Sequence, residues 1–305
     1  MPGLRWTDLT AAGTPVLWRL AGSSSLGALS VRSAASSTRR GDGWLTLGAG
    51  NRARAFAPGT DPLMAATALP DPHDPADLRA LVATNDRSGF GARIGALSSA
   101  LKAAGLSTAA AGGAGAQLGA MDGAGAVDEQ LGADESASSA TSRLVLVELP
   151  QVYSLEPGPL RDATLRTVDA AVGAAAAGLG PEDLLIVLGV SDGEIGASRL
   201  DVAMAKGPGF GRRWLTSEST RHQPIVQLVD VAPTVLTALG VAVPAEMIGG
   251  TWGSAGPPAS ADATAASTAD LDRLAGRTFA QSRLGSWFPS FFGWVGGVLA
   301  GLAAA

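Results

Sequence analysis

The stretch Leu184–Glu194 reads LLIVLGVSDGE and is the strongest fold signal in the chain. It is a short apolar run that ends in a Ser-Asp-Gly turn, a pattern typical of a strand buried on both faces. A similar run, RLVLVELP, spans residues 143–150. Between the two runs, residues 159–180 place apolar side chains on one helical face, namely Leu160, Leu165, Val168 and Val172. The three segments predict a right-handed βαβ unit.

Further strands and helices alternate on both sides of this unit. The expected strands are 26–33, 106–112, 199–207 and 224–230, and the expected helices are 14–22, 41–50, 90–105 and 230–240. Alternation of this kind is typical of helices layered on a parallel sheet. We therefore expect an α/β protein, specifically a three-layer α/β/α sandwich with a mostly parallel sheet.

Two regions lack the regular spacing of apolar residues that indicates a helix or a strand. Residues 58–75 are rich in Pro and Asp and predict a loop or insertion. Residues 112–142 are rich in Gly, Ala and Ser. We expect a partly ordered loop in the second region, and a small-residue helix packed on the sheet is the alternative.

The composition of the C-terminal part predicts a division of the chain. Residues 1–252 form the expected α/β domain, and residues 253–268 read as a linker because they are rich in Ala, Ser and Pro. Residues 269–305 begin with an amphipathic piece and end in Leu284–Ala305, which carries no charge. About 20 apolar residues suffice to cross a bilayer. The sequence thus predicts the start of a membrane anchor with the main domain outside the cytoplasm, and a buried C-terminal helix is the alternative.

Composition also excludes several classes of site. The chain has no Cys, which removes disulfides, thiolate metal sites and a Cys nucleophile. It has only two His, so a site with three His ligands is impossible. The formal net charge is −5, so the chain has no excess of basic residues. Nucleic acid is therefore not an expected partner.

Two carboxylates follow the two apolar strands of the βαβ unit. Asp192 comes directly after the second strand and Glu148 ends the first. Ligands of open α/β sheets bind outside the carboxyl ends of the strands, and hard divalent cations prefer oxygen ligands. One interpretation is a cation site at this edge. The alternative is that Asp192 forms an Asx-turn before Gly193.

Several motifs, in order along the chain, resemble the alkaline-phosphatase-like superfamily of metal-dependent phosphatases, phosphodiesterases and sulfatases. They are GLRWTDLTAAGTPVLWRLA near the start, SSTRRGDGWLTLGAGNRA next, LLIVLGVSDGE, and the late TSESTRHQPIVQLVDVAPTVLTALGVAVP. The resemblance covers about 240 residues. It implies a metal-bound Thr or Ser nucleophile at a helix start and an Asp-x-x-Pro-Thr helix late in the domain.

The resemblance assigns roles residue by residue. Thr38 falls at the position of the nucleophile, and a hydroxyl beside a divalent ion can be ionised for attack. Asp192 matches a metal-binding Asp, although Gly193 stands where the family has His. Glu148 and His222 are the further candidate ligands, and Asp230 is expected to cap the late helix.

The sequence departs from the family in its supply of ligands. A two-metal site of the family's kind needs several His, and the strand that carries the first family ligand is expected to precede Met1. We therefore expect an eroded metal site and a non-catalytic binding or envelope-related role. The alternative is an active phosphoesterase or sulfatase in which Thr38 attacks while Asp192, Glu148 and His222 hold one Zn, Mn or Mg ion. A truncated gene product is a third possibility.

Overall fold

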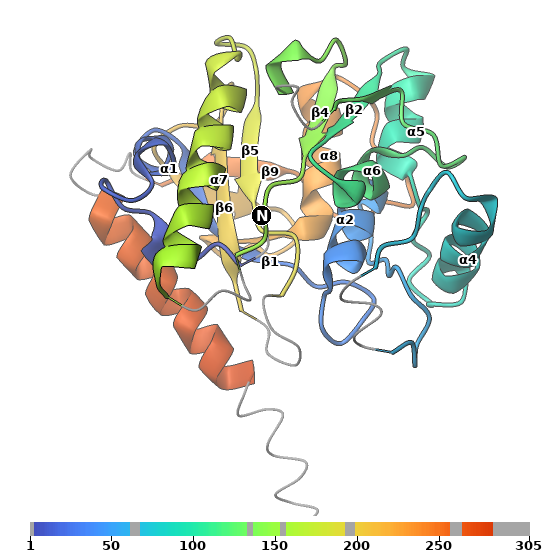
Figure 1. Cartoon of the computed structure of the whole chain (residues 1–305), viewed down its shortest axis with the longest axis horizontal. Coiled ribbons are helices and arrows are strands. Elements are labelled where there is room, and N and C mark those ends of the chain that lie inside the picture. Colours follow the sequence, from blue (N-terminus) through green and yellow to red (C-terminus); the bar gives the residue numbers. More distant parts are fainter. Residues whose placement is uncertain are drawn as a thin grey trace, which may run out of the picture.

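A computed structural model describes residues 3–61, 68–132, 137–152, 157–192, 199–256 and 264–282 (Figure 1). The helices are η1 (Trp6–Asp8), α1 (Pro15–Ala21), α2 (Arg40–Ala49), α4 (Pro75–Asp86), α5 (Ala96–Ala103), α6 (Ala114–Ala120), η2 (Ala137–Ser139), α7 (Pro159–Ala177), η3 (Leu228–Asp230), α8 (Val231–Ala238) and one over 264–282. The strands are β1 (Ser25–Ser30), β2 (Thr108–Ala111), β3 (Glu129–Gln130), β4 (Leu144–Val147), β5 (Leu185–Leu188), β6 (Asp201–Lys206), β7 (Trp214–Ser217), β8 (Ile225–Gln227) and β9 (Trp252–Ala255).

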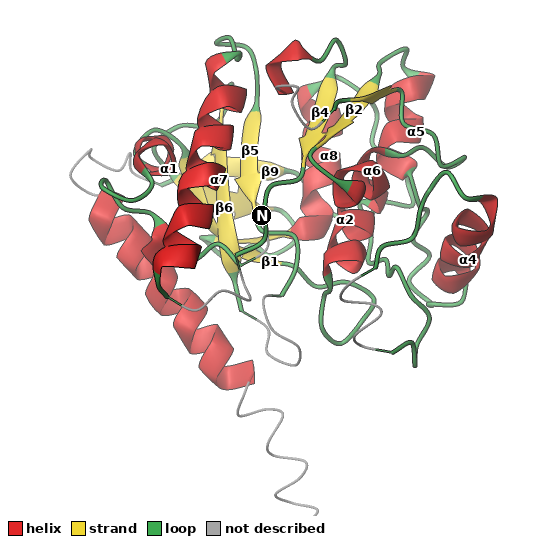
Figure 2. Ribbon diagram, in the orientation of Figure 1, coloured by secondary structure: helices red, strands yellow, loops and turns green. Residues whose placement is uncertain are grey.

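The described strands form two separate sheets (Figure 2). The larger sheet has the order β5-β6-β1-β7-β9, and β8 also pairs with β1. Strand β1 is parallel to β7 and β8, whereas the pairs β1–β6, β5–β6 and β7–β9 are antiparallel. The smaller sheet, β3-β2-β4, is parallel throughout.

The expected sandwich with a mostly parallel sheet is therefore wrong. Strand β6 returns antiparallel beside β5. In addition, β4 and β5, the two strands of the predicted βαβ unit, belong to different sheets and do not pair with each other in the described chain.

Helices cover both faces of the larger sheet. Along β6, Val202 and Met204 face a core that includes side chains of α1, α7 and the 264–282 helix. The alternate residues Ala203 and Ala205 face a core that includes side chains of α2, α5 and α8. This alternation follows from the two-residue period of a strand, and it makes the sheet apolar on both faces.

Residues 112–142 contain more order than expected. Helix α6 forms there and packs closely against α2. A β-carbon on Gly48 of α2 would lie 2.7 Å from the carbonyl oxygen of Gly119, so the two helices approach too closely for a larger residue. The small-residue helix, which was the alternative for this region, forms over Ala114–Ala120, whereas the described residues after it are mostly turns and loop.

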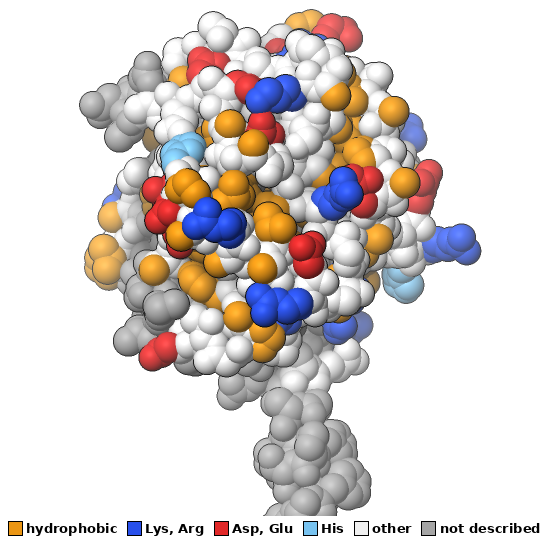
Figure 3. Space-filling view, turned by 90° about the vertical axis from the view of Figure 1, so that its right-hand side faces the viewer, with side chains coloured by type: hydrophobic (Ala, Val, Ile, Leu, Met, Phe, Trp, Pro, Cys, Tyr) orange, Lys and Arg blue, Asp and Glu red, His pale blue; other side chains and the backbone are white. Residues whose placement is uncertain are grey.

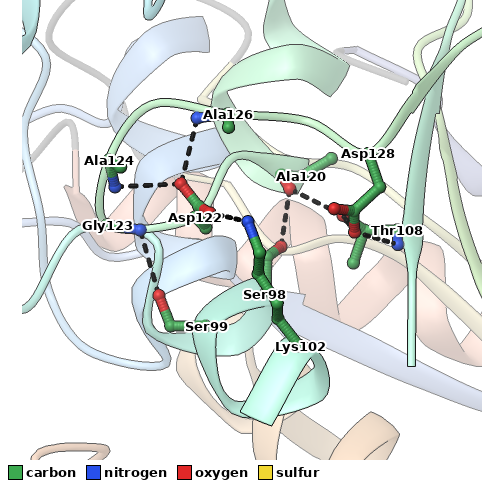
Figure 4. Close-up of polar contacts among 10 residues, drawn as sticks. All are labelled: Ser98, Ser99, Lys102, Thr108, Ala120, Asp122, Gly123, Ala124, Ala126 and Asp128. Carbon is green, nitrogen blue, oxygen red and sulfur yellow. Dashed lines mark hydrogen bonds and ion pairs between the residues drawn. The ribbon is translucent and has the colours of Figure 1, made fainter. Parts of the chain in front are cut away.

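A polar cluster fixes the chain that follows α6 (Figure 4). The carboxylate of Asp122 accepts hydrogen bonds from the backbone of Ala124 and Ala126 and from Nζ of Lys102, the last at 2.7 Å. Burial acts to raise the pKa of Asp122, but the Lys102 and backbone donors outweigh it and lower that pKa. The cluster thereby ties the start of this loop to α5.

The ends of the described chain pack together on one face of the larger sheet. The guanidinium of Arg161 in α7 forms a buried ion pair with Asp8, 2.5 Å from Nη2 to Oδ2. In the helix at 264–282, Leu271 and Ala275 are buried in the same core as Leu4. This helix of 19 residues therefore contributes to the domain core, and three of the four residues of β9 fall within the predicted linker 253–268.

The expected membrane partner is also corrected. Within the described residues, the chain contains no helix that is both long and apolar enough to cross a bilayer. The apolar run Leu284–Ala305 on which that prediction rested lies outside the described ranges.

Charged side chains are scattered over the face that carries α4 and α5 (Figure 3). Lys, Arg, Asp and Glu side chains alternate there with small and apolar ones. Among the described residues on this face, charges of one sign therefore do not gather into a continuous patch.

Candidate functional site

Three strand ends meet at one edge of the larger sheet. Because β1 and β5 are each antiparallel to β6, they run parallel to each other, and their carboxyl ends lie at the edge where β6 begins. This edge is the usual place for a ligand in an open α/β sheet. It holds the segment after β1 with Thr38, the end of β5 with Asp192, and Asp201 at the start of β6.

Thr38 and Asp192 are brought into direct contact. The backbone N–H of Thr38 donates to Oδ2 of Asp192 at 2.7 Å, and the N–H of Asp192 donates to the carbonyl of Thr38 at 2.8 Å. The Thr38 hydroxyl oxygen accepts the Ser33 N–H at 2.9 Å, and Thr38 is only 2% exposed. The two segments are thus joined by reciprocal hydrogen bonds, and the hydroxyl is enclosed.

A second carboxyl group lies in the field of Asp192. Asp201 is buried, and its Oδ2 has no hydrogen-bond partner among the described residues. Burial, together with repulsion from Asp192, raises the pKa of Asp201 well above its ordinary value. The hydroxyl of Ser191 is likewise buried without a partner within the described chain. Asp201 therefore favours its neutral, protonated form, in which the carboxyl group can donate a hydrogen bond.

Glu148 lies at the end of β4, and its carboxylate receives four hydrogen bonds. Arg40 donates twice, from Nε to Oε1 at 2.6 Å and from Nη2 to Oε2 at 2.5 Å. Trp44 Nε1 donates to Oε1 at 3.0 Å, and the backbone N–H of Gly115 donates to Oε2 at 2.9 Å. A carboxylate offers about four acceptor positions. All four acceptor positions of Glu148 are therefore used, and Arg40 balances the negative charge of the carboxylate.

The start of α2 connects these two clusters. Arg40 and Trp44 reach Glu148, while Gly43 lies between them in the sequence and faces the end of β5. A β-carbon on Gly43 would overlap the carbonyl oxygen of Val190. The absence of a side chain at this position lets α2 rest directly on the segment that carries Asp192.

His222 lies away from this edge. It precedes β8, which is parallel to β1 with Ala28 opposite Ile225. A residue three positions before Ile225 is therefore beside the amino-terminal half of β1, whereas Thr38 follows its carboxyl end. The exposed imidazole contacts the Gln223 carbonyl through Nδ1. The structure thus brings Thr38 and Asp192 together but leaves His222 outside their site.

Asp230 caps η3, the turn that leads directly into α8, because its carboxylate accepts the backbone N–H of Gln227 in a capping box. Its carboxylate accepts bonds from the hydroxyls of Ser217 and Ser219 and from the backbone N–H groups of Gln227 and Gly250. Its side chain makes no capping bond to α8. Asp230 also ties β7, β8 and the approach to β9 together.

The arrangement offers few ligands for a metal. Within the described ranges, there is no group of three His, Asp or Glu side chains placed to hold an ion. Asp192 and Asp201 form an acidic pair, and Glu148 is bound to Arg40. The chemistry that the edge offers is thus hydrogen bonding by carboxyl and backbone groups.

The raised pKa of Asp201 gives a pH prediction. A buried carboxyl whose pKa is higher in the folded state stabilises the fold fully below its unfolded pKa of about 3.9. That contribution is lost as the pH rises through the folded pKa. We expect the urea midpoint of the protein to fall as the pH is raised from about 4, and to fall less steeply in Asp201→Asn.

Two other buried carboxyl groups also contribute to the pH dependence of stability. Burial also raises the pKa of Asp42 and of Asp230, so the variant keeps part of the pH dependence. Asp270→Asn, at an exposed position, should show the parent profile. Superimposable profiles for the parent and Asp201→Asn would contradict the prediction.

Two residues of this region were missed by sequence reasoning. Asp201 is the first residue of β6. Because β6 is antiparallel to β5, its first residue lies at the sheet edge where β5 ends. The expected parallel sheet did not place Asp201 at this edge. Arg40 was not identified as a site residue, because nothing in SSTRR reveals its partner 108 positions away.

The comparisons with known proteins add no assignment. No family model matches the chain, and the search of curated proteins gives no match.

Proposed function

We propose that the chain is a non-catalytic binding protein, and that its Thr38–Asp192 edge corresponds to the catalytic edge of alkaline-phosphatase-like enzymes with the metal site eroded. The contact between Thr38 and Asp192 supports this correspondence, because the resemblance requires the nucleophile and a metal-binding Asp to be neighbours.

The observation that carries the proposal is the state of Glu148. An ion at this carboxylate would have to displace the guanidinium of Arg40 together with the Trp44 and Gly115 donors. Both partners of this ion pair are largely buried, at 24% and 4% side-chain exposure. Removing one partner from a buried pair typically costs 3–5 kcal/mol. The group thus serves to hold α2 against β4.

The enclosure of Thr38 supports the same conclusion. A nucleophilic hydroxyl must reach the substrate, and its oxygen must be activated by a base or an ion. Here the oxygen accepts the Ser33 N–H and is covered by the surrounding chain. The Thr38 hydroxyl therefore stabilises the loop between β1 and α2.

We expect no metal-dependent hydrolysis of nitrophenyl phosphate or nitrophenyl sulfate with Zn, Mn or Mg. The rates of the parent and of Thr38→Ser should equal the rate of a heat-denatured sample. Thr38→Ser keeps the hydroxyl that accepts the Ser33 bond and is therefore the control for folding.

A contrary result would be turnover that is lost with a chelator and in Thr38→Ala, while circular dichroism shows the variant to be folded. That outcome would establish the alternative, an active phosphoesterase or sulfatase.

A further inference from the structure

A cavity of about 740 Å³ lies between the two sheets. In Figure 2, β4 and β5 stand on either side of the gap between the sheets, and residues of both strands line the cavity. Binding sites for small molecules and peptides commonly occupy 300–1,000 Å³. The cavity therefore has the size of a ligand site, and it borders the Glu148 cluster at Trp44.

The walls of the cavity have the arrangement of an unfilled strand position. Strands β4 and β5 line it on two sides. Helix α7 contributes Val172 and Ala175. Helices α2 and α8, which belong to the other core, contribute Leu47 and Val235. A space bounded by two strands and by helices from two layers has the surroundings of one more strand.

The edge of β4 that lines the cavity carries unpaired backbone groups. The N–H groups of Leu144 and Glu148 donate to β2 and its flank, at Ser107 and Ala111. Successive amides of a strand point to opposite sides. Those of Val145 and Val147 therefore point away from β2, towards the cavity that both residues line.

The edge of β5 is complementary. Gly189 N–H donates to the carbonyl of Val202, so the alternate residues 185, 187 and 189 face β6. The amides of Leu184 and Ile186 point the other way, and both residues line the cavity. Leu184 and Ile186 on one wall, and Val145 and Val147 on the other, thus present backbone N–H and C=O groups towards the cavity, with partial positive and negative charge in turn.

We propose that this cavity binds an extended, apolar segment of a partner polypeptide, which inserts as a strand between β4 and β5. The inference rests on the proposed binding function and names its site and the chemistry of its partner. Only another extended backbone matches the alternating charges of both edges at once, which is the mode of strand addition.

The side chains that line the cavity determine which residue types the partner segment can carry. Because apolar helices cover both faces of the position, a partner must be apolar on both faces, and β-branched residues suit such a strand. The open positions run from Val145 to Val147 on one edge and from Leu184 to Ile186 on the other, so the paired part spans about 10 Å at about 3.3 Å per residue. A purely hydrocarbon ligand would leave the edge amides without hydrogen-bond partners, which is unfavourable for buried backbone groups.

The test is binding of a fluorescein-labelled peptide of six valine and isoleucine residues flanked by lysines, measured by fluorescence anisotropy with the full chain. A matched peptide carries N-methyl groups on alternate amides and keeps every side chain. We expect the parent peptide to bind and the N-methylated peptide to bind at least tenfold more weakly. Equal binding of the two peptides, or no binding of either, would overturn the proposal.

Two variants test the place of binding. Val147→Pro removes an N–H that points to the cavity and keeps the bonds to β2, so it should weaken the peptide at least tenfold. Ala175→Trp on α7 fills the cavity from one wall and should abolish binding whether or not the proline variant folds. Unchanged binding in a folded Ala175→Trp protein would overturn the assignment.

Three measurements separate the proposed strand site from other occupants of the cavity and from the proposed function: self-association of the chain, metal-dependent turnover and peptide binding. A dimer of the chain alone that the peptide dissociates would assign the position to a second copy and overturn the partner segment. Metal-dependent turnover would contradict the non-catalytic function and leave peptide binding unaffected. Absence of peptide binding together with absence of turnover would reject only the strand site.

Discussion

Gly43→Ala should lower the free energy of unfolding by about 3 kcal/mol or more. The added β-carbon would overlap the carbonyl oxygen of Val190, which is backbone and cannot turn aside. To make room, α2 would have to move away from β5. That movement would disturb Trp44, which donates to Glu148, and Thr38, which is joined to Asp192.

The same substitution at Gly276 is the matched control. Gly276 lies in the helix at 264–282, and a β-carbon there meets nothing within 4 Å. Gly276→Ala should therefore raise stability by roughly 0.5–1 kcal/mol, because alanine restricts the unfolded chain. Urea unfolding followed by circular dichroism measures both. If Gly43→Ala is as stable as the parent, the close approach of α2 to β5 is incorrect.

Glu148→Ala should cost about 3–5 kcal/mol, the usual range when one partner of a buried ion pair is removed. The change leaves the Arg40 guanidinium, Trp44 Nε1 and the Gly115 N–H without their common acceptor. Glu148→Gln should cost less, because an amide oxygen still accepts part of these bonds.

An exposed ion pair provides the comparison for this variant. Asp270 pairs with Arg273 at the surface, with side-chain exposures of 55% and 69%. Asp270→Ala should change stability by less than about 0.5 kcal/mol. Thermal unfolding of the three proteins at one pH measures the difference. Similar losses for Glu148→Ala and Asp270→Ala would mean that the Glu148 cluster is open to solvent.

Local sequence patterns predicted most of the helices and strands. The apolar face of α7 and the Gly that follows it gave a helix over 159–180, and the structure has Pro159–Ala177. The runs at β4, β5 and β6 were likewise recognised, because apolar periodicity depends on a few neighbouring residues. Helix α4 and the short strands β7 and β9 were missed, the last because its residues read as linker.

Long-range pairing was beyond these patterns. A buried strand has the same composition whether its neighbour is parallel or antiparallel, so β6 was placed in a parallel sheet. The site shares this difficulty. The motifs brought Thr38 and Asp192 together correctly in space, but His222 was included by its order in the sequence alone, and its strand enters the sheet from the opposite edge.

The central place of β1 has a consequence for biosynthesis. All its partners, at Asp201–Lys206, Trp214 and Ile225–Gln227, come late in translation. At about 5–20 residues per second, a ribosome needs on the order of 10–40 s to reach them after β1 emerges. During that interval the segment that becomes the buried central strand lacks every strand with which it pairs. Yield in cells should consequently depend on holdase capacity and elongation speed more than on the equilibrium stability of the finished molecule.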